Sequence, residues 1–178
     1  TTFDKGRSVQ QTLDGGYILT GESGGDIYLL KTDENGDEEW SQNQGFIGYD
    51  LGGGRSVQQT TDGGYIIIGR DGIYLIKTDG NGDEEWSQLH GSTGGDEGHS
   101  VQQTIDGGYV ITGYTNSFVG NGGINVFLIK TDGNGNEEWS QIHGGTGYDV
   151  GYSVQQTSDG GYIITGETSS FGNGSSDV

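Results

Sequence analysis

The stretch that decides the fold is SVQQTLDGGY, which occupies residues 8–17. The pattern SVQQTxDGGY returns at residues 56–65, 100–109 and 153–162. Its starting points are therefore 48, 44 and 53 residues apart. A second pattern, close to YLIKTDxNGxEEWSQ, lies between these copies and starts at Tyr28, Tyr74 and Phe127. Periods of this size are typical of repeat architectures, so we expect several copies of one structural unit.

Each unit offers four short strand candidates, which the first unit illustrates. Residues 8–12 alternate in polarity, residues 17–20 and 27–31 are largely apolar, and residues 39–41 are charged and amphipathic. Continuous apolar runs suit strands buried on both faces, so the middle two strands should be central and the outer two should flank them. The Asp-Gly-Gly between the first two candidates predicts a tight hairpin with a primed turn.

Four antiparallel strands in about 45 residues is the size of one β-propeller blade. A β-solenoid is the main alternative, but its rungs are shorter, at about 20–30 residues. The predicted fold class is therefore all-β, a β-propeller of four-stranded antiparallel blades with about three and a half blades in this chain. A single repeat domain should cover 1–178, with its blades at about 1–48, 49–95 and 96–148 and a half blade at 149–178.

The last two residues align with the start of a third strand, because Asp177 matches Asp26. A half blade would expose an unpaired strand edge, which proteins usually protect. We therefore expect either that the source protein continues or that another chain supplies the partner strands, so self-association through this edge is one prediction.

The composition excludes several classes of partner. Only 28% of the 178 residues are hydrophobic and the net charge is −19, but the apolar residues cluster and repeat, which argues against disorder. Seven Lys and Arg residues form no basic stripe, so no nucleic-acid partner is expected. No apolar run is long enough to insert into a membrane. The chain has no cysteine, which excludes thiolate metal sites and disulfides.

The two patterns, SVQQTxDGGYIITG and YLIKTDxNGNEEWSQ, resemble tandem repeats of secreted or surface proteins of archaea and bacteria. The resemblance covers essentially the whole chain. It implies a propeller-like fold and an extracellular or cell-surface location, and it carries no known activity and no catalytic residues. The spacing of Asp33, Gly36 and Trp40 is similar to the Asp-box of sialidases and to the quinoprotein repeat, but it departs from both by one residue.

Strand alternation sorts the connections onto two faces. The turns after the first and third strands of each unit share one face and have fixed lengths, so we call it the uniform face. The other connections share the variable face, where the loops between the second and third strands range from residues 70–71 to residues 114–124. Loops that vary on a rigid scaffold commonly carry function, so we expect a binding site on the variable face.

The long loops of the variable face hold the ligand-binding candidates. An aromatic ring flanked by amides suits sugar binding, and this pairing occurs at Phe118 with Asn121 and at Phe171 with Asn173. The alternative is that each phenylalanine covers its own blade end and plugs the core. Further candidates are His90 and His143, although their equivalent positions in two units also fit a repeated structural role.

Oxygen ligands recur with the spacing of the start of a calcium loop. The weak metal candidates are Asp33, Asn35, Asp37, Asp79, Asn81, Asp83, Asp132 and Asn134. The glycine of a calcium loop is replaced by Glu38, Glu84 and Glu137, so a hairpin turn is the competing interpretation. Calcium is accordingly the one cofactor considered, and no other is expected.

Aspartates just before each first strand, at residues 4, 50, 96 and 149, recur in all four units and suggest turn-stabilising or inter-blade hydrogen bonds. The string Gly21–Gly25 matches the GxSxG nucleophile motif but lacks the following helix that this chemistry requires. No carboxylate pair stands apart from the repeats as an acid/base couple. The chain is therefore predicted not to be an enzyme.

The predicted function is a non-catalytic extracellular repeat scaffold that presents loops for binding, adhesion or assembly, with a protein or glycan partner at the cell exterior. One alternative is a lectin-like carbohydrate-binding propeller. A second alternative, a propeller hydrolase, would need a unique polar cluster in the central channel, and the near-identical repeats argue against one.

Overall fold

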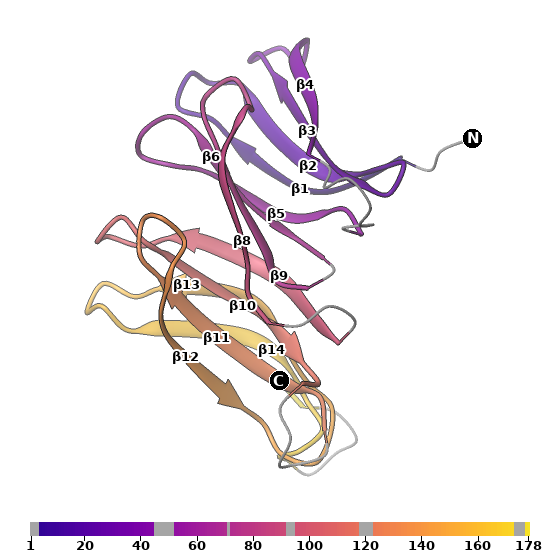
Figure 1. Ribbon diagram of the computed structural model, residues 1–178, viewed down its shortest axis with the longest axis vertical. Coiled ribbons are helices and arrows are strands. Elements are labelled where there is room, and N and C mark those ends of the chain that lie inside the picture. The colour runs from indigo at the N-terminus through magenta and orange to yellow at the C-terminus, as the bar shows by residue number, and fades with distance from the viewer. Residues whose placement is uncertain (1–3, 45–51, 71, 92–94, 118–122, 173–176) are drawn as a thin grey trace.

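The computed structural model describes residues 4–44, 52–70, 72–91, 95–117, 123–172 and 177–178. Across these ranges every regular element is a strand, and the strands form three four-stranded antiparallel sheets and one two-stranded sheet (Figure 1). Blade 1 consists of β1 (Asp4–Gln11), β2 (Tyr17–Ser23), β3 (Asp26–Thr32) and β4 (Glu38–Gln44). Blade 2 consists of β5 (Gly54–Gln59), β6 (Tyr65–Gly69), β7 (Tyr74–Thr78) and β8 (Glu84–Leu89).

The other two sheets continue the series. Blade 3 consists of β9 (Asp96–Gln103), β10 (Tyr109–Thr115), β11 (Asn125–Thr131) and β12 (Glu137–His143). The half blade consists of β13 (Asp149–Gln156) and β14 (Tyr162–Thr168). No helix in the described ranges is long and apolar enough to cross a membrane.

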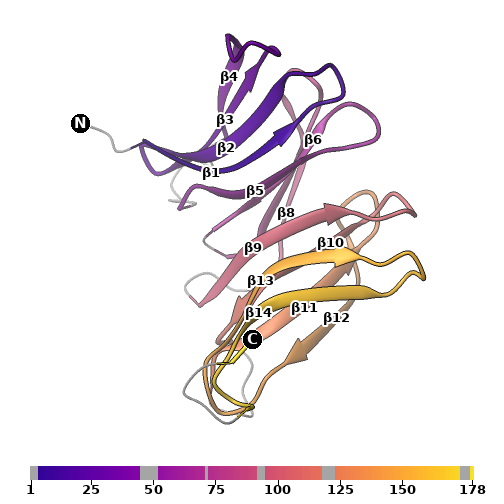
Figure 2. The same ribbon diagram turned by 180° about the vertical axis from the view of Figure 1, so that it is seen from behind.

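The strands of each sheet are neighbours in chain order, and the first strands of successive sheets contact one another. Figure 2 shows β1, β5, β9 and β13 running side by side, with the remaining strands of each sheet extending outward from them. First strands that line the axis and last strands at the rim are the arrangement of a β-propeller. The predicted fold class is confirmed, with three blades and a half blade in the described residues.

Apolar layers lie between the blades because the middle strands bury side chains on both faces. Alternate residues of blade 2 face opposite ways: Tyr65 and Ile67 pack toward blade 1, while Ile66 and Ile68 pack toward blade 3. The tryptophan of each complete blade also contacts the first tyrosine of the next blade's second strand, in the pairs Trp40–Tyr65, Trp86–Tyr109 and Trp139–Tyr162. These ring pairs therefore pack each blade against the next.

The SVQQ residues hydrogen-bond one blade to the next. The Gln59 backbone N–H donates to Oε1 of Gln10 at 2.7 Å, and the Gln59 side chain in turn accepts from the Leu13 N–H at 2.8 Å. The same backbone bond joins Gln103 to Gln58 and Gln156 to Gln102. A repeated inter-blade contact therefore explains why these glutamines recur in every unit.

The Asp-Gly-Gly hairpins are not primed turns, which corrects the sequence-based prediction. The Thr12 carbonyl accepts from the Gly15 N–H at 3.0 Å, and the Thr12 N–H donates to the Gly16 carbonyl at 2.9 Å. Gly15 has φ of 92°, and no described non-glycine residue has positive φ. This is a type I turn followed by one left-handed glycine, which also matches the twist of the two strands.

In each complete blade a buried lysine forms ion pairs with two carboxylates. Lys31, Lys77 and Lys130 are each 3% exposed, and each Nζ lies 2.9–3.0 Å from the aspartate of the Asp-Gly-Gly turn. Each Nζ also lies 2.7–2.9 Å from a glutamate of the fourth strand. The turn aspartates are therefore structural, because they connect the turns of the uniform face to the third strand through the lysine.

These ion pairs predict a loss of stability in acid. The Thr104 hydroxyl and then Lys130 lower the pKa of Asp106 to about 2, and Thr12 and Lys31 lower the pKa of Asp14. A lowered folded-state pKa contributes stability that is fully present above the ordinary value near 4 and lost as the pH falls toward 2. The carboxylates are exposed, so each pair contributes at most about 1 kcal/mol.

We expect urea unfolding of the chain, followed by circular dichroism, to show the free energy of unfolding falling between pH 4 and pH 2. Asp106→Asn should flatten part of this slope, because one of the titrating carboxylates is removed. An unchanged slope in Asp106→Asn would show that other groups control acid unfolding.

Candidate functional site

Two positions beside the axis differ between the four units. The residue before each SVQQ serine is Arg7, Arg55, His99 or Tyr152, although the residues that follow are identical. The residue after the glycine of each second strand also varies: it is glutamate at 22 and 167, arginine at 70 and tyrosine at 114. These positions lie at the variable-face ends of the inner strands. With their neighbours they form what we call the inner cluster: Lys5, Arg7, Glu22, Arg55, Arg70, Glu97, His99, Tyr114, Tyr148, Tyr152 and Glu167.

Glu97 on β9 is the centre of the charged part of this cluster. Its side chain is 15% exposed, and its carboxylate lies 3.1 Å from Nη2 of Arg55 and 3.2 Å from Nε of Arg70. His99 Nε2 lies 3.6 Å from the same carboxylate. Residues of blade 2 and blade 3 therefore meet at one carboxylate, whereas Glu22 pairs within blade 1, at 3.3 Å from Arg7.

Aromatic rings continue the cluster into the half blade. The His99 ring stacks on Tyr152 with centroids 5.6 Å apart and an interplanar angle of 12°, and it meets Tyr114 edge-on at 5.6 Å. The ring centroid of Tyr114 in turn lies 6.4 Å from that of Tyr148. Tyr148 is 43% and Tyr152 is 50% exposed, so both rings offer surface to a partner.

Burial and pairing set the charges of the cluster. Burial raises the pKa of Glu97, but the Tyr114 hydroxyl and the neighbouring arginines outweigh it, and the pKa lies below its ordinary value. Burial lowers the pKa of His99, so the ring is neutral at pH 7 and donates from Nδ1 to the Gly151 carbonyl at 3.0 Å. Burial and the hydrogen bond to Glu97 raise the pKa of Tyr114. The ionised, paired carboxylate of Glu97 beside the neutral ring of His99 is suited to binding a partner rather than to acid/base chemistry.

The cationic residues are divided between two roles. Of the seven Lys and Arg residues, three are the buried lysines of the complete blades. The other four, Lys5, Arg7, Arg55 and Arg70, all belong to the inner cluster. A chain with 26 acidic residues therefore gathers its remaining positive charge at this one place.

The structure does not bring the predicted ligand candidates together. Phe118, Asn121 and Asn173 lie outside the described residues. Phe171 is 62% exposed, so the alternative in which this ring plugs the core is wrong. His90 is 8% exposed and lies against the turn of blade 3 at Gly135, whereas the equivalent His143 is exposed. Their difference arises because the turn between β11 and β12 covers His90, whereas the described half blade has no corresponding turn to cover His143.

The metal candidates stabilise hairpin turns. Oδ1 of Asp33 accepts from the backbone N–H groups of Asn35 at 2.8 Å and Asp37 at 2.9 Å. The same bonds form at the equivalent turns, whose residues are Asp79, Asn81, Asp83, Asp132, Asn134 and Asn136. Within the described ranges no three His, Cys, Asp or Glu side chains are grouped to hold a metal ion. Calcium binding stays a prediction.

The aspartates that precede the first strands have the predicted structural role where they are buried. Asp96 accepts from the Thr115 hydroxyl at 2.5 Å and from Ser117 at 3.0 Å. Asp149 accepts from Thr168 at 2.5 Å and from Ser170 at 2.6 Å. Asp4 is exposed, and Asp50 lies outside the described residues. The two buried aspartates thus fasten the loops after β10 and β14.

The inner cluster corrects the expectation that near-identical repeats leave no unique polar cluster near the axis. Each of its two defining positions holds three different residue types across the four units, although the positions are equivalent. An alignment of the four units would have revealed them, because Arg7, Arg55, His99 and Tyr152 interrupt an otherwise constant stretch. Repeated motifs do not reveal them, because these residues are where the repeats differ.

Solved structures show the same architecture. The chain is similar to a protein of unknown function from Bacteroides caccae, with 11% identity and a TM-score of 0.55 over 83% of this chain and 48% of that one. It is also similar to the WD40 domain of Pan2 from Neurospora crassa, with 12% identity and a TM-score of 0.62 over 85% of this chain and 41% of that one. The chain thus spans less than half of each of these proteins.

No protein-family model matches the sequence, and no curated protein matches it either. At these identities the structural likeness defines the fold. The chain is a β-propeller repeat protein with WD40-like four-stranded blades, and the inner cluster is its candidate binding site.

Proposed function

We propose that this chain is a non-catalytic interaction scaffold that binds a protein partner at the inner cluster. The observation that carries the proposal is that the residues before each SVQQ serine and after each second-strand glycine vary between the units, and that three arginines and three tyrosines gather in the cluster they form. Tyrosine and arginine are enriched among the residues that dominate the energy of protein interfaces. The uniform face, in contrast, is occupied by repeated structural turns.

The chemistry of the cluster favours a peptide segment that carries aromatic and carboxylate side chains. Tyr148 and Tyr152 present ring faces for stacking, and the four paired cations of the cluster favour an acidic group nearby. We further propose, from the resemblance of the repeats and the acidity of the chain, that this binding takes place at the cell exterior. A lectin-like function is the alternative, and the exposed Phe171 ring favours it.

A displayed library of random peptides, selected on the full chain, tests the proposal. Selected peptides should bind the double variant Tyr148→Ala/Tyr152→Ala at least about 30-fold more weakly, since a hot-spot residue contributes 2 kcal/mol or more. The matched control is Tyr17→Ala, which removes a tyrosine that is 37% exposed and lies outside the cluster, and it should leave the affinity unchanged.

A glycan array with the same variants separates the two functions. Glycan binding that is lost in Phe171→Ala and kept in the double tyrosine variant would favour the lectin. Peptides that bind the double variant as tightly as the native chain would refute the role of the inner cluster.

A further inference from the structure

One edge of β14 is prepared for a third strand. In each complete blade the second strand pairs on both sides, as β6 does with β5 and β7. β14 pairs with β13 along one edge, and at its other edge the described residues form one bridge, between Thr168 and Asp177. This bridge matches the pair Ser23 and Asp26, which opens the pairing of β2 with β3 in blade 1. The register of an added strand is therefore already defined.

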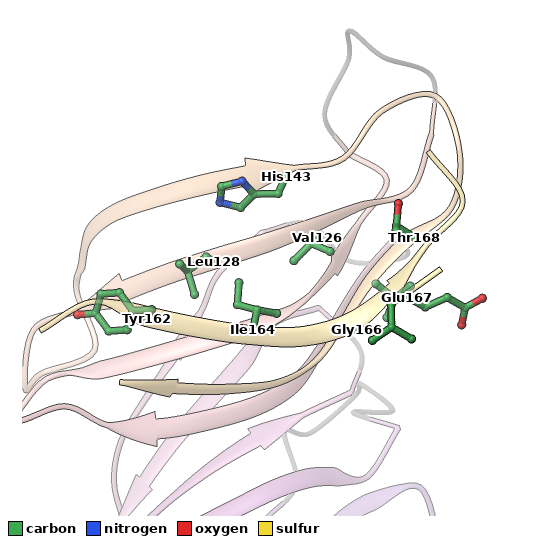
Figure 3. A pocket seen from close by; sticks show the side chains of 10 residues that line it. Val126, Leu128, His143, Tyr162, Ile164, Gly166, Glu167 and Thr168 are labelled. Carbon is green, nitrogen blue, oxygen red and sulfur yellow. The ribbon is translucent and has the colours of Figure 1, made fainter. Parts of the chain in front are cut away.

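An apolar groove lies along this edge. It has a volume of about 360 Å³ and is lined by Val126 and Leu128 of β11 and by Tyr162 and Ile164 of β14. Figure 3 shows these side chains on the two strands that border the groove. In blade 3 the residues Phe127 and Ile129 of its third strand pack at the corresponding place against blade 2, and they are 1% and 4% exposed. Blade 3 thus shows that a strand with apolar side chains at alternate positions covers such a groove.

A carboxylate near the groove is also complementary to the lysine of a third strand. In the three complete blades the turn aspartate pairs with the buried lysine of the third strand. The equivalent Asp159 accepts from Thr157 and from the Gly161 N–H, and among the described residues it forms no ion pair. By the register of Ile66 with Lys77, an incoming lysine would lie opposite Ile163, which is 55% exposed. Its alkyl chain would cover that side chain while Nζ reaches Asp159.

Two further side chains of blade 3 lie where, in the other blades, the turn between the third and fourth strands of the next blade packs. Gln44 Nε2 donates to the Gly82 carbonyl of the next blade at 2.6 Å, and the equivalent of Gln44 in blade 3 is His143, which is exposed and lines the groove. The turn glycine Gly82 is buried against the Trp40 ring, since an added Cβ would lie 2.7 Å from it. The equivalent ring in blade 3 is that of Trp139, which is partly exposed and contacts Tyr162.

We propose that this edge binds a β-hairpin with the sequence pattern of the repeat's own third and fourth strands, an aromatic residue followed by Leu-Ile-Lys-Thr-Asp-x-Asn-Gly-x-Glu-Glu-Trp. The hairpin adds to β14 as a third and fourth strand, so that backbone hydrogen bonds supply affinity and side-chain pockets supply specificity. Its first and third side chains fill the groove, its lysine pairs with Asp159, and its turn lies between Trp139 and His143. This surface is separate from the inner cluster.

The test is a synthetic peptide with the sequence of residues 74–88, YLIKTDGNGDEEWSQ, titrated into the full 178-residue chain. Calorimetry should give one peptide per chain, and the melting temperature should rise with the peptide concentration. Lys77→Ala in the peptide should weaken binding about tenfold, and Asp159→Asn in the chain should have a similar effect. Combined, the two changes should cost little more than either alone, because both remove the same contact.

Asp106→Asn is the matched control, since it alters the same turn in a blade that already holds its lysine. It should leave the peptide affinity within twofold. The proposal is overturned if the peptide does not bind at millimolar concentration, or if its lysine and Asp159 contribute nothing. A dimer of the chain that the peptide does not dissociate would assign the edge to a second copy instead and would equally overturn the proposal.

Discussion

Phe127→Ala is expected to lower the free energy of unfolding by about 3–5 kcal/mol, as large-to-small substitutions of buried aromatic residues do. The ring is 1% exposed and lies in the apolar layer between blades 2 and 3, together with Ile68 and Leu75. Its removal leaves a cavity that rigid sheets on both sides cannot close, because their strands are fixed by backbone ladders. The cost should therefore lie near the upper end of this range.

Phe171→Ala is the matched control, since it removes the same ring from a position that is 62% exposed. Its effect on stability should stay within about 0.5 kcal/mol. Urea unfolding of both variants, followed by tryptophan fluorescence and circular dichroism, measures the difference. Equal losses in the two variants would mean that the apolar layer does not stabilise the fold in the way described above.

Most of the architecture can be predicted from the sequence because every unit repeats the same local patterns of apolar, polar and turn-forming residues. The apolar runs at residues 65–68 and 74–76 lie in central strands, and the flanking strands are where the alternating patterns place them. The start of the first strand is less predictable: β1 begins at Asp4, before the predicted residue 8, because a bulge between Gly6 and Ser8 allows pairing to continue through polar residues. Hydropathy alone does not reveal a bulge.

Local sequence patterns could not predict the type of the Asp-Gly-Gly turns or the inner cluster. An Asp-Gly-Gly stretch is compatible with a primed turn or with a type I turn and a left-handed glycine, and the pairing of Thr12 with Gly16 decides between them. His90 and His143 have similar local sequences, yet only His90 is covered by the turn between the third and fourth strands of the next blade. The inner cluster likewise depends on which blades become neighbours around the axis, and that order is a property of the folded chain.

Glu97→Ala is expected to destabilise the chain by about 2–3 kcal/mol at pH 7, because a partly buried carboxylate that accepts hydrogen bonds from two guanidinium groups leaves both without that contact when it is removed. Arg55 and Arg70 lose the carboxylate that they share. Glu22→Ala is the control: that carboxylate pairs with exposed Lys5 and with Arg7 within blade 1, so its loss should cost less than about 1 kcal/mol.

The effect of Glu97→Ala should also depend on pH. The pKa of Glu97 is lowered in the folded chain, so its contribution to stability is fully present above the ordinary value of 4.5 and is lost as the pH falls through the lowered value. The difference in unfolding free energy between the native chain and Glu97→Ala should therefore shrink from pH 7 to pH 3, in urea titrations at each pH. A difference that stays constant would show that Glu97 acts through packing alone, and the inner cluster would then owe its shape to the stacked rings of His99 and Tyr152 rather than to the charge that joins blades 2 and 3.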